Sequence, residues 1–431
     1  MGSGEGTGME REMGLSTRLG AAAGKEVNDE WLRARTLANL AAGLGKQHEA
    51  RRIQASLPKE FGQTPGDRAF LYAAFLHART QDDFYPAGRV HVGAVVLPAA
   101  LVMLDAPERF LSALKAGYEV LATLSEGYSR IAQARGYRPT GLFGVFGAAA
   151  AAAVAAGLGQ REIESAFGFA AAASGGTNQA WIEGTDEWLV EVASAARAGV
   201  EAALFAKAGL SGAVRSLDGQ SGWAKAFFDD PAGERLMSAL SDERPRTPLV
   251  AMKLFPVSGI AQVATALACQ LGKKVRATDI SEIRLYLSIS DASYPGSASK
   301  GPFRSRSDAL MSVPLSVAIG LAHGYVSYDG WTVGNGEARR LLGLVEIHGV
   351  SEIQDSDARL SVRTSAGLHE IEGTSNDYLF PSWEQTMQNI EGLATRCEAP
   401  LPLVKELATS LSKTEPSVDH IRQVLNRTLE R

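Results

Sequence analysis

The sequence predicts a mainly α protein, with a large all-helical domain and an inserted, smaller α+β lid domain. Alanine-rich amphipathic segments recur from Asp29 to about Leu210, separated by short glycine or proline breaks. Strand-like alternation of apolar and polar residues appears only after about Pro245. After Pro381 the helical period returns, which predicts that both ends of the chain belong to the helical domain.

The chain has 431 residues and is 45% hydrophobic, which is enough to bury the cores of two domains. We place the first part of the helical domain at residues 28–252, the lid domain at 253–383 and the C-terminal part of the helical domain at 384–431. The glycine-rich start, residues 1–27, carries acidic residues where a signal peptide would need basic ones. We expect it to be a disordered tail.

Individual elements follow from local periodicity. Helices are expected over Glu30–Leu44, Arg109–Ala134, Glu187–Ala208 and, in the lid, Gly259–Leu271. Strands are expected over Ile283–Ile289, Leu344–Ile347, Arg359–Arg363 and Leu368–Ile371, and the TSAG between the last two suits a hairpin. The lid is therefore expected to combine helices with an antiparallel sheet. The apolar stretch 141–158 is too rich in alanine and glycine to predict a membrane span.

Composition excludes several function classes. Lys and Arg total 43 against 48 Asp and Glu, so a net charge of -5 offers no basic surface for nucleic acid or an anionic membrane. Cys269 and Cys397 are isolated, and the seven histidines show no HExxH spacing, so no metal is expected. The glycines of residues 141–147 follow no strand and precede no GK[ST], so no cofactor is expected either. We expect a cytoplasmic protein that acts on a small molecule.

His91 is the best candidate for a catalytic base. It follows Asp82 and Asp83 across a short loop and begins the apolar segment HVGAVVLPAALVML. A histidine at a helix N-terminus tends to stay neutral and can then accept a proton. The alternative is that the two carboxylates are capping or solvated loop charges and that His91 merely starts a helix.

Several longer segments, taken together, resemble one family. In chain order they are DDFYPAGRVHVGAVVLPAAL, RGYRPTGLFGVFGAAAAAAVAAGLG, AARAGVEAALFAKAGLSGA, LDGQSGW, KLFPVSGIAQ and RSDALMSVPLSVAIGLAHG. From about Asn28 onward the chain is similar to the MmgE/PrpD family, which includes 2-methylcitrate dehydratase, cis-aconitate decarboxylase and iminodisuccinate epimerase. The resemblance implies a helical domain with a lid, a homodimer, and metal-free chemistry through carbanion-like character beside a carboxylate.

The resemblance also assigns residues. It implies catalytic positions at Asp82, Asp83 and His91, although the loop that carries them is shortened here. Lys253, in the segment KLFP, matches a lysine that opens the lid, and its ammonium group would hold a substrate carboxylate or a developing enolate.

Other positions depart from the family pattern. Arg138 stands where a histidine is usual, and Trp188 and Glu191 take the places of a lysine and a histidine. Ala298 replaces a tyrosine, for which only the nearby Tyr294 could substitute. We expect the substrate to be bound by Arg138, Trp188, Glu191 and Tyr294. It should not be one of the usual tricarboxylates, because a pocket for three carboxylates needs several cations close together.

Three functions follow from these residues. The first is a lyase of dehydratase or decarboxylase type, in which His91 removes a proton next to a carbonyl or carboxylate of a specialised metabolite and a leaving group departs. The second is an epimerase or cyclase that uses the same proton abstraction, with a more apolar pocket formed by Trp188, Leu142 and Phe143. The third is a non-catalytic relative that keeps the fold alone.

Overall fold

The computed structural model describes residues 14–22, 24, 27–332 and 336–430. Most of the expected N-terminal tail lies outside these residues. One part of it differs from the prediction, because Leu15–Ala22 forms helix α2. Its Leu15 and Leu19 are buried, and α2 packs against two helices of the large domain, α7 (Phe110–Ala134) and α9 (Gln160–Ala173). Two leucines spaced by four residues give this short segment an apolar face, which the neighbouring helices cover.

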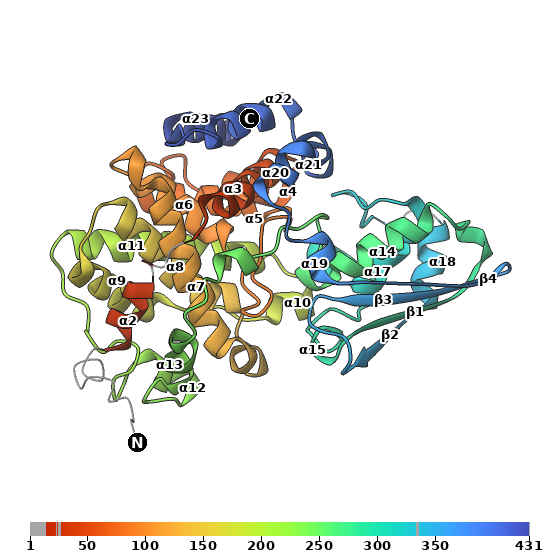
Figure 1. Cartoon of the computed structure of the whole chain (residues 1–431), viewed down its shortest axis with the longest axis horizontal. Coiled ribbons are helices and arrows are strands. Elements are labelled where there is room, and N and C mark those ends of the chain that lie inside the picture. The colour runs from red at the N-terminus through yellow and green to blue at the C-terminus, as the bar shows by residue number, and fades with distance from the viewer. Residues whose placement is uncertain (1–13, 23, 25–26, 333–335, 431) are drawn as a thin grey trace, which may run out of the picture.

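The alanine-rich helix α8 (Pro139–Ala155) is the centre of the helical part (Figure 1). It is surrounded by α7, α9, α6 (Gly93–Met103) and α11 (Glu187–Lys207). Small residues allow this close packing, since a β-carbon on Gly199 of α11 would lie 2.7 Å from the carbonyl oxygen of Val145. Because α8 is buried within the chain, its small side chains are not available to a dimer interface, and the homodimer that the resemblance implies stays a prediction.

The remaining helices complete this part of the molecule. They are α3 (Asp29–Leu44), α4 (His48–Ser56), α5 (Pro65–His77), α10 (Gln179–Glu183), α12 (Trp223–Phe228), α13 (Glu234–Ser241), α20 (Trp383–Gln388), α21 (Ile390–Arg396), α22 (Leu401–Leu411) and α23 (Val418–Glu430). The last four, from the C-terminal end of the chain, pack against α3 near the N-terminal end (Figure 1). The helical period after Pro381 had indicated this return.

The smaller α+β part lies to one side of the helical part in Figure 1. Its helices are α14 (Gln262–Gly272), α15 (Ile289–Ala292), α16 (Arg306–Leu310), α17 (Val313–His323), α18 (Gly336–Leu344) and α19 (Ser375–Tyr378). The chain enters and leaves it side by side, because the N–H of Met252 donates to the carbonyl of Leu379 at 2.8 Å. We call this part, residues 253–378, the lid.

A sheet of four strands forms among the described residues of the lid. The strands β1 (Ile280–Ser288), β2 (Val345–Val350), β3 (Ala358–Thr364) and β4 (Gly367–Gly373) lie in the order β2-β1-β3-β4. β3 and β4 form the expected hairpin, with Thr364 paired to Gly367. The expectation of a purely antiparallel sheet is wrong, since β1 and β2 run parallel. The chain between them contains α15 to α18, and such a long crossover returns the strand in the same direction.

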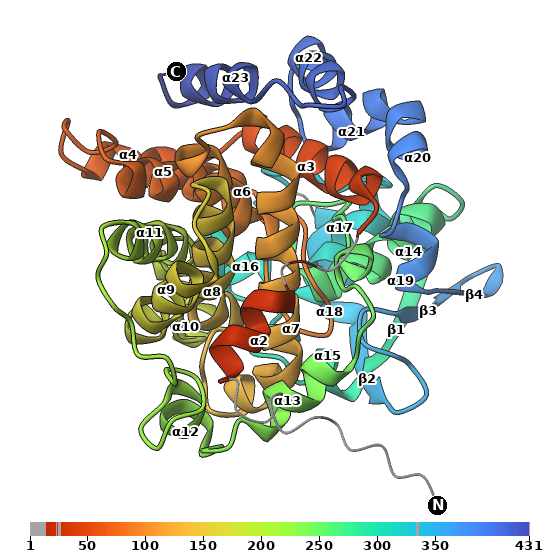
Figure 2. The same ribbon diagram turned by 60° about the vertical axis from the view of Figure 1, so that its left-hand side comes forward.

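The lid joins the helical part beside a loop that follows α5. Phe84 in this loop and Ala251 exchange two backbone hydrogen bonds of 3.0 and 2.8 Å. The pairing places Lys253, two residues after Ala251, next to Asp82. Figure 2 shows the sheet of the lid beside the helical part from a second direction. None of the described helices combines the length and hydropathy needed to cross a lipid bilayer.

Candidate active site

The loop between α5 and α6 places three polar side chains together. His77 is the last residue of α5, and Asp82 follows in the loop. A tight turn then brings the chain back, closed by the N–H of Tyr85, which donates to the carbonyl of Val90 at 2.8 Å. His91 comes next, and its own N–H donates to the hydroxyl of Thr140 at 3.0 Å, which anchors its backbone to the start of α8.

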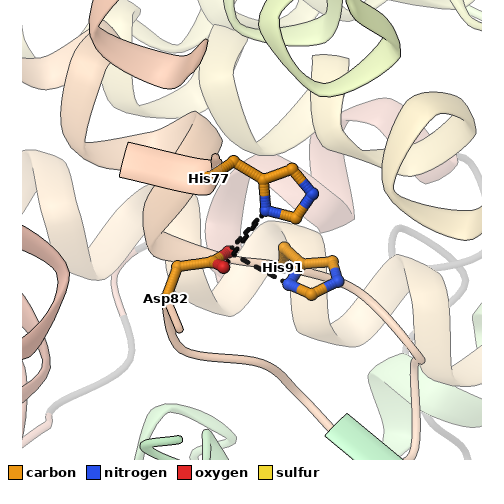
Figure 3. Close-up of side chains that lie close together, drawn as sticks. All are labelled: His77, Asp82 and His91. Atoms are coloured by element: carbon orange, nitrogen blue, oxygen red, sulfur yellow. Dashed lines mark hydrogen bonds and ion pairs between the residues drawn. The ribbon is translucent and has the colours of Figure 1, made fainter. Parts of the chain in front are cut away.

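The Asp82 carboxylate lies between two histidines (Figure 3). It is 3.0 Å from Nδ1 of His77 and 3.0 Å from Nδ1 of His91. The Lys253 ammonium lies 3.8 Å from the same carboxylate and 3.3 Å from Nδ1 of His91, and it donates to the carbonyl of Thr80 at 2.6 Å. Burial opposes ionisation of Asp82, but the two histidines and Lys253 together hold its pKa well below the usual value. Asp82 is therefore a buried anion with a cation beside it.

Hydrogen-bond donors and acceptors fix the protons on both imidazoles. Nη2 of Arg138 lies 3.0 Å from Nε2 of His77, and a guanidinium group only donates, so this nitrogen accepts and Nδ1–H donates to Asp82. On His91, Nδ1 lies 3.0 Å from Asp82 and 3.3 Å from the Lys253 nitrogen, and we assign its proton by the nearer partner, a carboxylate that only accepts. Nε2 then keeps its lone pair, and it points away from the carboxylate (Figure 3). Burial lowers the pKa of His77 to about 4 and, with Lys253 adding to it, that of His91 to about 3. Both rings are neutral at pH 7, and Nε2 of His91 is free to accept a proton.

His91 borders a narrow pocket of about 60 Å³ between the helical part and the lid. Its walls are mostly apolar and include Phe84 and Trp181 from the helical part and Tyr294 and Met311 from the lid. We call this space the cleft pocket. The cleft pocket is a small space with a neutral base, His91, at its border, which is the usual arrangement in an enzyme active site.

Comparison with known proteins finds a family that matches this region of the chain. Residues 32–235 match the family model of the MmgE/PrpD N-terminal domain. These residues therefore form an MmgE/PrpD N-terminal domain. A cis-aconitate decarboxylase-like protein of Aspergillus oryzae is 31% identical over 152 residues, which are 32% of this chain and 31% of that relative. The chain thus aligns with about a third of the length of the curated relative it matches.

The MmgE/PrpD match covers His77, Asp82, His91 and Arg138, whereas Lys253 comes from the lid beyond it. Of the four residues expected to bind substrate, Tyr294 lies in the wall of the cleft pocket. The other three form a buried layer behind His77. The Arg138 guanidinium donates to the carbonyl of Trp188 and lies 3.3 Å from Glu191.

Trp188 and Glu191 already have hydrogen-bond partners within the protein. The indole N–H of Trp188 donates to the Ser307 hydroxyl at 2.9 Å, and its ring lies 5.2 Å from that of His77. Glu191 accepts from the N–H of Thr177 at 2.7 Å as well as pairing with Arg138. In this structure Arg138, Trp188 and Glu191 support His77, and a substrate in the cleft pocket would meet His91 first. Leu142 and Phe143, which we had expected to make the pocket apolar, are buried in α8 instead.

His77 was missed by our reading of the sequence, where it counted only as one of seven scattered histidines. A signal for it existed, because it ends the largely apolar segment AFLYAAFLH, five residues before Asp82. The alternative role for these residues is to bind a metal ion, since His77, Asp82 and His91 offer ligand atoms within 4.8 Å of one another. The cations of Lys253 and Arg138 lie 3.3 and 3.0 Å from the imidazole nitrogens, and their charges would repel a bound metal ion.

Asp83 faces away from the two histidines and ties α6 to the bundle. Its carboxylate accepts from the N–H of Gly93 at 2.7 Å, from the Tyr118 hydroxyl at 2.6 Å and from the Asn39 amide at 2.9 Å. Asn39 also accepts from the N–H of Asp83 at 2.9 Å. Burial raises the pKa of this carboxyl to about 6, against the effect of these hydrogen bonds. Of the two adjacent aspartates, Asp82 serves the site and Asp83 has a structural position.

We therefore expect Asp83→Ala to lower the free energy of unfolding by about 2–4 kcal/mol, because it leaves three buried donors without an acceptor. Urea denaturation followed by circular dichroism measures this change. Asp419→Ala, at a carboxylate that is 85% exposed, is the matched control and should change stability by less than about 0.5 kcal/mol. Equal stability of the two variants would contradict the structural assignment of Asp83.

Proposed function

We propose that this chain is a lyase of the MmgE/PrpD type, and that it removes a proton next to a carbonyl or carboxylate of a small metabolite and then eliminates a leaving group. The observation that carries the proposal is the Asp82–His91 pair, in which Asp82 accepts from Nδ1 of His91 while Nε2 is left facing away from it. The similarity to a cis-aconitate decarboxylase-like protein supports the same broad class.

The residues present define the proton-transfer step. Nε2 of His91 takes the proton from carbon, and the two electrons of the C–H bond form an enolate or the new double bond. Asp82 stabilises the imidazolium that results, because Nδ1–H of the ring already donates to it. The Lys253 charge lies behind His91, where it balances Asp82 and keeps His91 unprotonated before the reaction. The leaving group departs with its electron pair and receives a proton from the hydroxyl of Tyr294, a residue that also lines the cleft pocket.

The same geometry also supports the epimerase or cyclase alternative. Tyr294 and His91 both border the cleft pocket, so one could remove a proton and the other return one. Burial raises the pKa of Tyr294, which keeps its hydroxyl protonated and able to donate. The mass of the product separates the two reactions, because elimination loses atoms and epimerisation retains all of them.

Incubation in D₂O tests the proposal without knowledge of the leaving group. A panel of 3-hydroxy acids and 3-keto acids is incubated with the enzyme, and deuterium at the carbon beside the carboxylate is followed by proton NMR. Exchange or elimination that depends on the enzyme supports proton abstraction. Absence of both across a panel that demonstrably binds would favour a non-catalytic relative.

Lys253→Met should lower kcat by on the order of a hundredfold, because it removes the cation that balances the charge of Asp82. Arg138 cannot take over this role at the same position. Burial lowers the pKa of Lys253 to about 8, so wild-type turnover should fall as pH rises through about 8 and the charge is lost. No loss is expected near pH 6.5, since the pKa of His91 lies at about 3. The measurement is the pH dependence of kcat for both proteins.

Lys405→Met, at an ammonium that is 51% exposed, is the matched control and should keep the wild-type profile. If the fall near pH 8 persists in Lys253→Met, it belongs to another group and the role given to Lys253 is wrong.

A further inference from the structure

A helix N-terminus borders the cleft pocket together with His91. Ser258 precedes a short turn, Gly259–Ala261, that runs directly into α14. Ser258, Gly259 and Ile260 all line the cleft pocket. The N–H of Ala261 donates to the carbonyl of Ser258, but those of Gly259 and Ile260 have no acceptor among the described residues. Free N–H groups at the positive end of a helix attract an anion.

The Ser258 side chain is a second, independent observation at the same place. It is only 8% exposed, and it makes neither a capping hydrogen bond nor any other hydrogen bond within the described part of the chain. A serine at this position usually folds back onto the helix N–H groups. Here the Ser258 hydroxyl has no hydrogen-bond partner among the described residues, so it is available to a ligand in the pocket.

Gly259 lets the turn reach this position. A β-carbon at Gly259 would lie 2.8 Å from the ring of Phe84, closer than side-chain atoms pack. Because glycine has none, the backbone N–H groups approach the wall of the pocket that the helical part provides. Ser258, Gly259 and Ile260 thus offer one hydroxyl and two N–H groups to a single ligand group.

The arginines near the pocket are already neutralised. Arg89, which lines it, lies 2.5 Å from Asp291 and 3.1 Å from Asp355 of the lid. Arg138 is paired with Glu191 behind His77. Citrate-like substrates with three carboxylates need several available cations together, and these two are committed to protein carboxylates.

Much of the remaining wall of the pocket is apolar. Phe84, Trp181 and Met311 are buried and contribute ring and thioether surface to its walls, and Ile260 adds an aliphatic side chain. A ligand that fills this space gains free energy by burying apolar surface, whereas a second carboxylate would lose its hydration without a partner.

We propose that the substrate carries a single carboxylate, held by the Ser258 hydroxyl and the N–H groups of Gly259 and Ile260, and that its remainder is apolar. The inference rests on the proposed function, since it names the substrate class of the same site. It places the carboxylate in the pocket that His91 borders, where the N–H groups would stabilise the negative charge that grows as the neighbouring carbon loses its proton.

Calorimetric titration with three probes tests this inference. The probes are 3-phenylpropanoate with one carboxylate, citrate with three and 3-phenylpropan-1-ol with none. We expect 3-phenylpropanoate to bind the wild-type protein at least about tenfold more tightly than either of the others. Tighter binding of citrate, equal binding of the alcohol, or no binding of 3-phenylpropanoate at millimolar concentration would each overturn the inference.

Two variants of Ser258 locate the carboxylate. Aspartate is as favourable as serine at the position before a helix, so Ser258→Asp should fold. Its negative charge should weaken the binding of 3-phenylpropanoate at least about tenfold. Ser258→Ala should weaken this binding by roughly threefold to tenfold, because one hydrogen bond is lost. Ser382→Asp, the same change before α20 and outside the lining of the cleft pocket, is the matched control and should bind like the wild type. Unchanged affinity in both Ser258 variants would contradict the assignment.

His91→Ala separates this inference from the proposed function. It should abolish deuterium exchange while 3-phenylpropanoate still binds within about threefold of the wild type, because the carboxylate contacts remain. If the preference for one carboxylate holds but exchange survives in His91→Ala, the proposed function fails alone. If exchange is lost but citrate binds best, the substrate class fails alone.

Discussion

Replacing His91 with alanine is expected to lower kcat by about 10²- to 10⁴-fold, the usual contribution of a positioned general base. The reason is geometric, because His91 is the histidine that borders the cleft pocket, while Nε2 of His77 is occupied by Arg138. Single-turnover rates and steady-state kinetics on the substrate found in the D₂O panel measure the loss. The fold should survive, since the His91 side chain is 19% exposed and its backbone anchor to Thr140 does not involve the ring.

His48→Ala is the matched control for this experiment. His48 is 67% exposed and pairs only with the surface carboxylate Asp329, so its loss should leave kcat unchanged. A folded His91→Ala variant with near wild-type turnover would mean that the base lies elsewhere and would remove the central residue of the proposed mechanism.

Asp82→Asn is expected to have an effect of similar size on kcat, about 10³-fold or more, and to destabilise the protein as well. The amide has nearly the shape of the carboxylate, but it is neutral, and its NH₂ group would take the place of the carboxylate oxygen that lies 3.1 Å from Nδ1 of His77. A donor there weakens the hydrogen bonding of this ring or changes its tautomer. The Lys253 charge would also lose its buried counter-charge, which costs about 3–5 kcal/mol when one partner of a buried pair is removed.

Two measurements distinguish the effects of Asp82→Asn. Nitrogen-15 NMR of the imidazoles reports the tautomer of His77 and His91, and urea denaturation reports stability. Asp329→Asn, at a carboxylate that is 46% exposed, is the matched control and should change neither kcat nor the imidazole signals of His77 and His91. A variant that loses stability but keeps wild-type turnover and tautomers would show that Asp82 only holds the fold.

Much of the fold could be predicted because helix and hairpin signals are local in the sequence. The expected helices Glu30–Leu44, Arg109–Ala134 and Glu187–Ala208 correspond to α3, α7 and α11, within one or two residues at each end. The hairpin of β3 and β4 follows its TSAG turn in the same way. The parallel pairing of β1 with β2 could not be predicted, because no local pattern states how a strand is paired across a long crossover.

The candidate site was predictable only in part. Asp82 and His91 share one loop, so their nearness follows from the chain itself, and the structure brings Lys253 to them through the pairing of Phe84 with Ala251. Arg138 and Trp188 were expected to meet the substrate, yet both are buried behind His77. A substitution within a family pattern reveals that a side chain has changed and does not reveal which way it points.

The sequence by itself determined the helical core, the lid that interrupts it and the loop that carries Asp82, Asp83 and His91, since all of these rest on residue type and spacing along the chain. Only the tertiary structure decided which of the two adjacent aspartates lies against the imidazole of His91. Consecutive side chains of an irregular loop take directions set by their packing, and here Asn39 and Tyr118 of distant helices hold Asp83, while His77 and Lys253 surround Asp82. The sequence could likewise not predict that the hydroxyl of Ser258 makes no capping hydrogen bond. Whether a serine caps its own helix or lines a pocket depends on the space around it.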